Sequence, residues 1–194
     1  MTITLRPVLE SDRHLLFDLY ASTRQAELAQ VPWTGAQKQA FLEMQFAAQT
    51  EGYRTRRPNA AHEMICRNEV AVGRLYIDRL PERLHIVDIT VAPESRNAGI
   101  GSAVLKGILA EADRSGKSVS IYVESFNPSL RLFSRLGFRT ASEDGFLLLL
   151  ERPPVTASAS AHTKDRRFRM HESTLGIETL PQQTGVDVPR RLAP

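Results

Sequence analysis

A glycine-containing turn between a strand and a helix is the feature that most restricts the fold of this chain. The strand before it is β-branched and apolar, and Pro93 ends it because proline has no N–H for a sheet ladder. Apolar residues at helical spacing predict a helix from Ser102 to Arg114. The turn reads Arg96-x-x-Gly99-x-Gly101, so its backbone can approach a ligand and the first helical N–H groups stay free. A phosphate or pyrophosphate is therefore the expected ligand.

Two other phosphate-binding loops do not fit this turn. A nucleoside-triphosphate loop requires a lysine after its last glycine, and here Ser102 follows Gly101. A dinucleotide fingerprint has the pattern Gly-x-Gly-x-x-Gly after an early strand, and the spacing here is different. The two glycines alone would also suit an ordinary strand-to-helix turn, so their interpretation depends on a second motif.

That second motif lies one strand downstream, between Asn127 and Phe138, and reads Asn-Pro-Ser-Leu-Arg-Leu-Phe-Ser-Arg-Leu-Gly-Phe. Together with the turn it resembles the GNAT superfamily of acyl-CoA-dependent N-acyltransferases. That family has a pyrophosphate loop Arg/Gln-x-x-Gly-x-Gly/Ala and, later, a segment Asn-Pro-x-x-x-Leu-Tyr-x-x-Leu-Gly-Phe. The resemblance covers about residues 2–151 and departs at Phe133, where the family usually has Tyr.

The resemblance implies that acetyl-CoA is the acyl donor. The residues expected to bind it are Val91, Arg96, Asn97, Ala98, Gly99, Ile100, Gly101, Ser102, Asn127 and Phe133. A backbone N–H near Val91 would hold the thioester carbonyl, and Asn127 would hold the pantetheine arm or order a water chain. Because Phe133 has no O–H, the leaving thiolate departs unprotonated or Tyr122 protonates it.

The general base stays open among four polar residues on the two strands that should border the cleft, namely His85, Asp88, Tyr122 and Glu124. Asp88 interrupts an apolar run, where a carboxylate without a partner is costly, and it is either the base or a structural carboxylate. His85 has the nearer-neutral intrinsic pKa but follows a turn and could be exposed. Glu124 would equally suit a solvated strand end. We expect no metal site, because the five histidines show no paired spacing.

Periodicity and turn signals predict the order strand, helix, helix, three strands, helix, strand, helix, strand, strand. Ser11 or Asp12 would cap the first helix, which ends near residue 29. Thr34 would cap the second, over residues 35–53, with Phe41, Met44, Gln45 and Ala48 facing inward. The order is that of an α/β protein. The resemblance further implies a GNAT-like mixed, mostly antiparallel sheet, splayed between its fourth and fifth strands and flanked by helices.

The composition changes after residue 152. Residues 1–152 are expected to form one acetyltransferase-like domain and residues 153–161 a Pro/Ser/Ala linker. The remainder is expected to be a basic, largely disordered tail, with a partner-binding segment as the alternative. Residues 1–151 hold equal numbers of acidic and basic side chains, so the excess positive charge belongs to the tail. We therefore expect no nucleic-acid partner for the domain.

Other features bear on location and partners. The N-terminus lacks a signal-peptide layout, no apolar run could span a membrane, and the single Cys66 suits a reducing compartment, so a cytoplasmic protein without a membrane partner is expected. The arginines at 54, 56 and 57 are either a solvated helix end or a clamp for an acidic acceptor or the CoA 3′-phosphate. A homodimer stays open.

The sequence thus favours an acetyl-CoA-dependent N-acetyltransferase that acts by direct attack in a ternary complex. Its acceptor would be a primary amine of a small molecule or protein, of unknown identity. The competing hypothesis is a CoA-binding regulatory or interaction module with little turnover, which Phe133 and the long tail would suit.

Overall fold

The computed structural model describes residues 1–155, and the predicted tail lies outside the described residues apart from residues 153–155. The elements are β1 (Ile3–Pro7), α1 (Arg13–Ala29), α2 (Gly35–Arg56), β2 (Ala61–Arg67), β3 (Val70–Arg79), β4 (Arg83–Val91), α3 (Ile100–Ser115), β5 (Ser118–Glu124), α4 (Leu130–Arg135), β6 (Arg139–Asp144) and β7 (Leu147–Arg152). Short 3₁₀ turns precede α1 and α3. The predicted element order is confirmed, with ends shifted by up to three residues.

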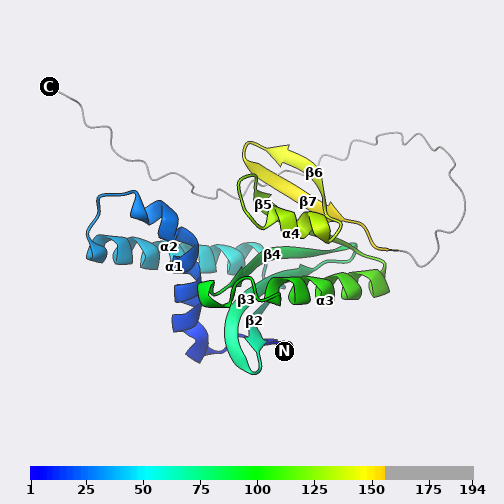
Figure 1. Ribbon diagram of the computed structural model, residues 1–194, viewed down its shortest axis with the longest axis horizontal. Helices are drawn as coiled ribbons and strands as arrows, with labels where there is room; N and C mark the ends of the chain where they lie inside the picture. Colours follow the sequence, from blue (N-terminus) through cyan, green and yellow to red (C-terminus); the bar gives the residue numbers. More distant parts are fainter. Residues whose placement is uncertain (156–194) are drawn as a thin grey trace, which may run out of the picture. The chain divides into compact units, whose positions relative to one another are not determined.

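The strands form one seven-stranded sheet in the order β1-β2-β3-β4-β5-β7-β6 (Figure 1). Every neighbouring pair is antiparallel except β4 and β5, which are parallel. These two strands pair only from Arg83 to Ile86 on β4 and from Ser118 to Ile121 on β5. Both strands then continue without pairing, to Val91 and Glu124. The predicted mixed sheet, splayed between its fourth and fifth strands, is therefore confirmed.

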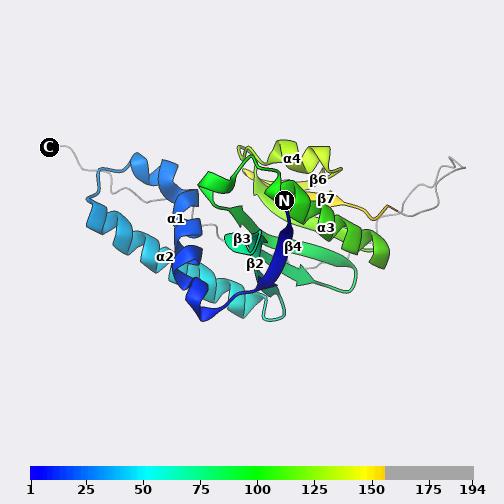
Figure 2. The same ribbon diagram turned by 60° about the horizontal axis from the view of Figure 1, so that its bottom comes forward.

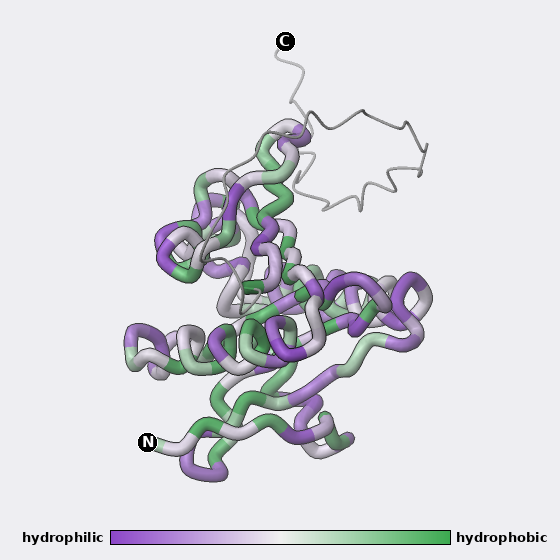
Figure 3. The backbone as a smooth tube through the Cα atoms, turned by 90° about the vertical axis from the view of Figure 1, so that its right-hand side faces the viewer, coloured by the Kyte–Doolittle hydropathy of each residue, from purple (hydrophilic) through white to green (hydrophobic). Residues whose placement is uncertain are grey.

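One face of the sheet packs against α3, which runs alongside the strands in both ribbon views (Figures 1 and 2). Because side chains alternate along a strand, every second residue of β3, β4 and β5 points to this helix. The shared core contains Leu75, Ile77, Leu84, Ile86, Ile100, Val104, Leu105, Ile108, Val119 and Ile121. Figure 3 shows green, hydrophobic stretches along the strands and an alternation of green and purple, hydrophilic residues along the helices. The α3 face is thus the main apolar core.

The other face of β2, β3 and β4 lies toward α1 and α2. Leu16 and Leu19 of α1 pack with Met64 and Cys66 of β2. The two helices contact each other through Phe46, whose ring centroid lies 5.7 Å from those of Phe17 and Tyr20. Among residues 1–155, no helix is long and apolar enough to cross a membrane.

The predicted inward face of α2 is partly wrong. Thr34 does cap the helix, accepting a hydrogen bond from the Gln37 N–H at 3.3 Å. However, Met44 is 58% exposed and Ala48 is also exposed, while the inward side chains include Leu42 and Phe46. The sequence of α2 has no continuous apolar stripe, so its rotation is set by the aromatic contacts with α1 and not by its own pattern.

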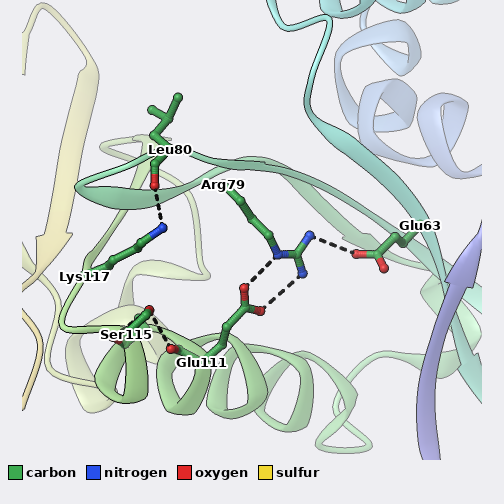
Figure 4. A network of polar contacts seen from close by, with 7 residues as sticks. Glu63, Arg79, Leu80, Glu111, Ser115 and Lys117 are labelled. Atoms are coloured by element: carbon green, nitrogen blue, oxygen red, sulfur yellow. Dashed lines mark hydrogen bonds and ion pairs between the residues drawn. The ribbon is translucent and has the colours of Figure 1, made fainter.

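A polar network joins α3 to the sheet (Figure 4). Arg79 of β3 donates to both carboxylate oxygens of Glu111 on α3, at 2.8 and 3.3 Å, and lies 3.9 Å from Glu63 of β2. Lys117, just after the helix, donates to the Leu80 carbonyl at 2.9 Å. These contacts fix the C-terminal half of α3 against β3.

The last described residues are also bound to α3. Arg152 forms a two-point ion pair with Asp113, at 2.6 and 3.0 Å, and the Val155 N–H donates to the same carboxylate at 2.8 Å. The arginine beside it holds the pKa of the Asp113 carboxyl below its usual range. The ordered unit therefore continues beyond Arg152 to at least Val155.

Asp12 stands at the start of α1 but does not cap it through its side chain. Its carboxylate instead accepts two hydrogen bonds from Arg6 of β1, both at 2.7 Å, and one from the Leu9 N–H at 2.8 Å. Asp12 is therefore the N-cap of the helix, as one of the two predicted candidates, but its side chain makes no capping hydrogen bond because its carboxylate is bound to the β1 arginine. Asp12 thereby joins the first strand to the first helix.

We expect the Asp12 contacts to make stability depend on pH. The Arg6 guanidinium lowers the Asp12 pKa from 3.8 to about 2. A lowered folded-state pKa contributes stability that is complete above the unfolded pKa and is lost as the pH falls through the folded one. Urea unfolding should show Asp12→Asn less stable than the wild type at pH 6, with the difference shrinking between pH 4 and pH 2. A difference that stayed constant down to pH 2 would contradict this explanation.

Candidate functional site

A β-bulge in β4 decides which side chains face α2. Tyr76 of β3 pairs with Asp88, but the next residue, Ile77, pairs with Ile86, so Val87 is an extra residue in β4. Without it, His85 and Asp88, three positions apart, would point to opposite faces of the sheet. Because of the bulge both point away from α3 and toward α2.

A small cavity lies on this face, between α2 and strands β2 to β4. Its volume is about 160 Å³, and its lining residues are Gln49, Thr50, Tyr53, Arg54, His62, Arg74, Tyr76 and Asp88. The wall is partly aromatic, since the ring centroid of Tyr76 lies 5.1 Å from that of Tyr53 and 4.8 Å from that of His62. Every lining residue carries a polar group, and the aromatic rings add apolar surface, so the cavity suits a small polar molecule.

The floor of the cavity holds a buried ion pair. The Arg74 side chain is only 6% exposed, and its Nη2 pairs with the Asp88 carboxylate. The same Nη2 donates to Gln49 Oε1 at 3.0 Å, and Asp88 also accepts a hydrogen bond from the Thr90 hydroxyl at 2.9 Å. Asp88 is therefore a partnered carboxylate at the cavity wall, held in place by β3 and β4.

Two histidines near the cavity are neutral at neutral pH. Burial lowers the pKa of His62 to about 4, and the positive charge of Arg74 adds to this effect. Burial likewise lowers the pKa of His85 to about 4. His85 is 5% exposed, so of the two alternatives for this residue the exposed one does not hold. Its Nδ1 lies 2.9 Å from the Ser120 hydroxyl of β5, and it does not line the cavity.

Tyr122 and Glu124 lie on β5 beyond the last residue that pairs with β4. Tyr122 is 43% exposed, and the edge of its ring meets the His85 ring at a centroid distance of 5.8 Å. Glu124 is partly exposed at the end of the strand. Val123, which lies between them, points into the core on the α3 side. Because side chains alternate along a strand, Tyr122 and Glu124 point to the opposite face, which also carries Asp88, and they border the splayed opening there.

The arginines at the end of α2 have different partners. Arg57 pairs with buried Asp78 of β3 at 3.2 Å, so it is a structural contact. Arg54 pairs with Glu51 at 3.0 Å and also lines the cavity. Arg56 is exposed.

The predicted phosphate turn has the backbone that an anion site needs. Asn97 and Gly99 have positive φ values of 59° and 78°, and Gly99 is the N-cap of α3. The first helical hydrogen bond runs from Ala103 N–H to Gly99, so the N–H groups of Ile100, Gly101 and Ser102 have no helical acceptor. Together with the helix dipole they favour an anion at this turn.

Other residues predicted to bind CoA have local partners. Arg96 donates from Nε to the Val91 carbonyl at 3.0 Å and from Nη2 to Ser22 of α1 at 3.2 Å, so it connects the turn to the end of β4. The Asn127 side chain accepts from the Ser129 N–H at 2.9 Å just before α4. Phe133 is 2% exposed and packs edge-to-face on Phe138, with centroids 5.3 Å apart. Binding of acetyl-CoA by Phe133 stays a prediction.

The structure thus brings Asp88 to a cavity and places the phosphate turn at the end of the same strand. The sequence reasoning missed six lining residues, namely Gln49, Thr50, Tyr53, His62, Arg74 and Tyr76. A signal for two of them was present, because Arg74, Tyr76 and Asp78 alternate with apolar residues inside a strand that is buried nearly throughout. Alternating polar residues in a buried strand indicate a covered polar face.

Gly73 fixes how closely β3 approaches the end of β4. A Cβ on Gly73 would overlap the Thr90 carbonyl oxygen and lie 3.2 Å from the Val91 Cα. We expect Gly73→Ala to lower the free energy of unfolding by about 1–3 kcal/mol and to weaken CoA binding, because the end of β4 must move. Gly107→Ala is the control: its Cβ meets open space on α3, and it should add about 0.5–1 kcal/mol. Urea unfolding and calorimetry measure both, and equal effects of the two substitutions would contradict the prediction.

Comparisons with known proteins agree with this geometry. Residues 20–138 match the model of the Acetyltransferase (GNAT) family, whereas no curated protein matches the chain. PaiA N-acetyltransferase from Thermoplasma acidophilum, solved with coenzyme A, is similar with a TM-score of 0.60 and 14% identity, covering 79% of this chain and 99% of that chain. A GNAT family acetyltransferase from Elizabethkingia anophelis with acetyl-CoA bound has a TM-score of 0.52 and 18% identity, covering 78% and 97%.

A third similar structure is the ribosomal-protein-S18-alanine N-acetyltransferase from Escherichia coli, with a TM-score of 0.53 and 16% identity, covering 84% of this chain and 100% of that chain. At such identities these structures show a shared fold. The family match spans more than half of the sequence and contains β4, the phosphate turn and α3. The chain therefore belongs to the GNAT family of acetyltransferases.

Proposed function

We propose that this protein is an N-acetyltransferase that moves the acetyl group of acetyl-CoA to a primary amine by direct attack in a ternary complex. One observation carries the proposal: β4 bears Asp88 at the wall of a small cavity, continues past its last pairing with β5, and ends at the predicted phosphate turn. Donor and acceptor would thus meet along a single strand.

In this proposal the donor lies in the opening between β4 and β5. Its pyrophosphate binds the N–H groups of the turn from Asn97 to Ser102, where two positive φ values and the start of α3 favour an anion. The pantetheine arm runs between the unpaired strand ends, which offer free backbone groups. A backbone N–H near Val91 holds the thioester carbonyl and stabilises the negative charge that develops on it.

The acceptor amine reaches the thioester from the cavity. It arrives protonated, and Asp88 accepts the proton directly or through a water molecule. The free amine nitrogen then bonds to the thioester carbon, the C–S bond breaks, and the nitrogen loses its second proton to a water molecule as the amide forms. The lowered pKa of His85 makes it a poor base at neutral pH. Because the His85 ring contacts the Tyr122 ring, we assign His85 the role of positioning Tyr122.

We propose Tyr122 as the acid that protonates the departing thiolate. Its ring is 43% exposed at the opening, whereas Phe133 is buried against Phe138 and has no O–H. Tyr122→Phe is expected to lower kcat about 10-fold or more with little change in the dissociation constant of CoA, because the lost O–H acts in the transition state. Phe133→Tyr should leave kcat unchanged or lower it. A rise in turnover with Phe133→Tyr would instead indicate that the acid acts from position 133 and not from Tyr122.

The test of the proposed function is release of free thiol from acetyl-CoA with a panel of primary amines, alongside calorimetry of CoA binding. We expect saturable binding and amine-dependent thiol release. Tight CoA binding without turnover on any amine, peptide or aminoglycoside would instead indicate a regulatory module. From its buried free thiol at Cys66 we also propose a reducing, cytoplasmic location.

A further inference from the structure

The last three strands of the sheet, β5, β7 and β6, leave one face partly exposed. On the core side, Leu150 of β7 is buried and Leu148 packs beside it. Because side chains alternate along a strand, Leu147 and Leu149 point to the opposite face. The helices on that side, α1 and α2, contact strands β2 to β4, and Figure 1 shows β5, β6 and β7 apart from both helices. We call the face that carries Leu147 and Leu149 the open face.

The strand register shows which other residues belong to the open face. Residues that pair directly across antiparallel strands have their side chains on the same side of the sheet. Two rows cross the open face from β5 through β7 to β6, namely Tyr122–Leu149–Ser142 and Glu124–Leu147–Asp144. Tyr122 is 43% exposed, Asp144 is exposed, and the two leucines are partly exposed. The open face therefore has an apolar centre with polar residues beside it.

Two exposed aromatic rings extend the apolar centre at the end of β5 and β7. Phe126 is 69% exposed and Phe146 is 45% exposed, and their ring centroids lie 6.2 Å apart. The Ser125 N–H donates to the Phe146 carbonyl at 2.7 Å, which holds the β6–β7 turn beside the end of β5. Single exposed apolar side chains are common, whereas a contiguous group with a polar rim marks a binding surface.

The charge of the rim limits what can bind there. Glu124 and Asp144 stand on either side of Leu147, two strand spacings or about 10 Å apart. Among residues 1–155 neither carboxylate forms an ion pair. The cations Arg83 and Arg139 lie at the opposite end of these strands, beside Glu151. Two copies of the open face would bring like charges together, so the acidic end favours a cationic partner.

The position of Tyr122 connects the open face with the proposed reaction. Tyr122 borders the opening between β4 and β5, and its row continues across the open face. The cavity at Asp88 has a volume of about 160 Å³, so it holds a small polar molecule or only the amine-bearing end of a larger one. A polyamine or an aminosugar has no apolar group for the leucines and the phenyl rings. A larger acceptor with both apolar and cationic groups uses both surfaces.

We propose that the acceptor is a polypeptide whose primary amine enters the opening and whose adjoining apolar and cationic side chains bind the open face. This inference rests on the proposed function and specifies its substrate class. The apolar side chains pack on Leu147, Leu149 and Phe146, and the cationic ones pair with Glu124 and Asp144. Charge pairs at such a rim act mainly on specificity and on the rate of association, and salt weakens them.

The experiment compares peptides that carry one reactive amine each. The probes are amides with a free N-terminal alanine and the sequences Ala-Arg-Leu-Arg-Leu-Gly, Ala-Glu-Leu-Glu-Leu-Gly and Ala-Arg-Ser-Arg-Ser-Gly. A second set has the same residues around one central lysine behind an acetylated N-terminus. In thiol release from acetyl-CoA, we expect the Arg/Leu peptide of the reactive set to exceed each of the other two about 10-fold or more in kcat/KM. Its advantage over the Glu peptide should shrink between about 0.05 and 1 M sodium chloride, because salt screens exposed charges.

Variants on the β6–β7 hairpin separate recognition from folding. Asp144→Asn should reduce the advantage of Arg over Glu, and Phe146→Ser the advantage of Leu over Ser, each to a few-fold or less. Both residues are exposed, so the fold should be kept, and calorimetry with CoA checks this. Glu143→Gln is the matched control, because Glu143 precedes Asp144 but pairs with Leu148 and so points away from the open face. It removes the same charge and should keep both preferences in full.

The outcomes distinguish this inference from the proposed function. Equal turnover of the three peptides, or faster turnover of ethanolamine than of any peptide, would overturn the polypeptide assignment and leave the acetyltransferase intact. Binding of the Arg/Leu peptide to the protein saturated with CoA, weakened by Asp144→Asn but not by Glu143→Gln and without turnover, would support the open face and overturn the proposed function. A dimer in sedimentation experiments that Phe146→Ser breaks would assign the face to a second copy and overturn the inference. If no peptide binds or reacts, the inference is wrong.

Discussion

Replacing Asp88 with asparagine is expected to lower kcat/KM by a factor of about 10²–10⁴, the usual contribution of a positioned general base. Asparagine keeps the size of the side chain and can still accept hydrogen bonds from Arg74 and Thr90, but it cannot take a proton from an ammonium group. The dissociation constant of CoA should be unchanged, because the phosphate turn is untouched. Thiol-release kinetics and calorimetry measure the two quantities.

Asp78→Asn is the matched control for this prediction. Asp78 is also a buried carboxylate on the α2 side of the sheet and pairs with Arg57, but it does not line the cavity. Removing either carboxylate leaves an arginine partly unpaired, so both variants are expected to unfold at lower urea concentrations. Only Asp88→Asn should lose activity in proportion to the missing base. Equal activity losses in the two variants would show that the effect of Asp88 is structural.

The second large effect is expected at Gly101, in the first turn of α3. A Cβ at this position makes only an ordinary contact, 3.6 Å from Leu132 Cδ2, so a side chain can be introduced. Gly101→Asp should keep or raise stability, because an acidic residue in the first turn favours the helix dipole. It should weaken CoA binding on the order of 100-fold or more, since a carboxylate close to a pyrophosphate at a partly screened surface costs several kcal/mol.

Gly107→Asp provides the control for the change in charge. Gly107 is exposed, two turns further along α3, with open space around its Cβ position. This variant carries the same added charge on the same helix and should bind CoA like the wild type. If Gly101→Asp bound CoA normally in calorimetry, the pyrophosphate would have to lie elsewhere.

The backbone of the predicted phosphate turn could be predicted from the sequence because it depends on residues that are consecutive in the chain. A strand end, glycines and a helix start are consecutive in the chain, so their spacing alone predicts free N–H groups at one point. The order of the strands followed for the same reason, since turns and alternating patterns mark each strand separately. Only the ends of the elements shifted, as at α2, which continues to Arg56.

The cavity was not predictable in this way, because it depends on contacts between distant segments. Arg74 and Asp88 meet across two strands, and Gln49 comes from a helix whose rotation the sequence did not reveal. The bulge at Val87 adds a further difficulty. Counting alternate residues along β4 places Asp88 on the α3 face, and only the observed pairing with Tyr76 places it in the cavity.

The short parallel pairing of β4 and β5 has a mechanical consequence. Only four residue pairs join these strands, whereas six join β5 to β7. The two halves of the sheet therefore meet at a hinge, and the hydrogen bonds near that hinge do little to resist a change in the angle between them. Resistance has to come from α3, whose apolar side chains pack on residues of both β4 and β5. The apolar core beneath that helix thus sets the width of the opening between β4 and β5 as well as the stability of the fold.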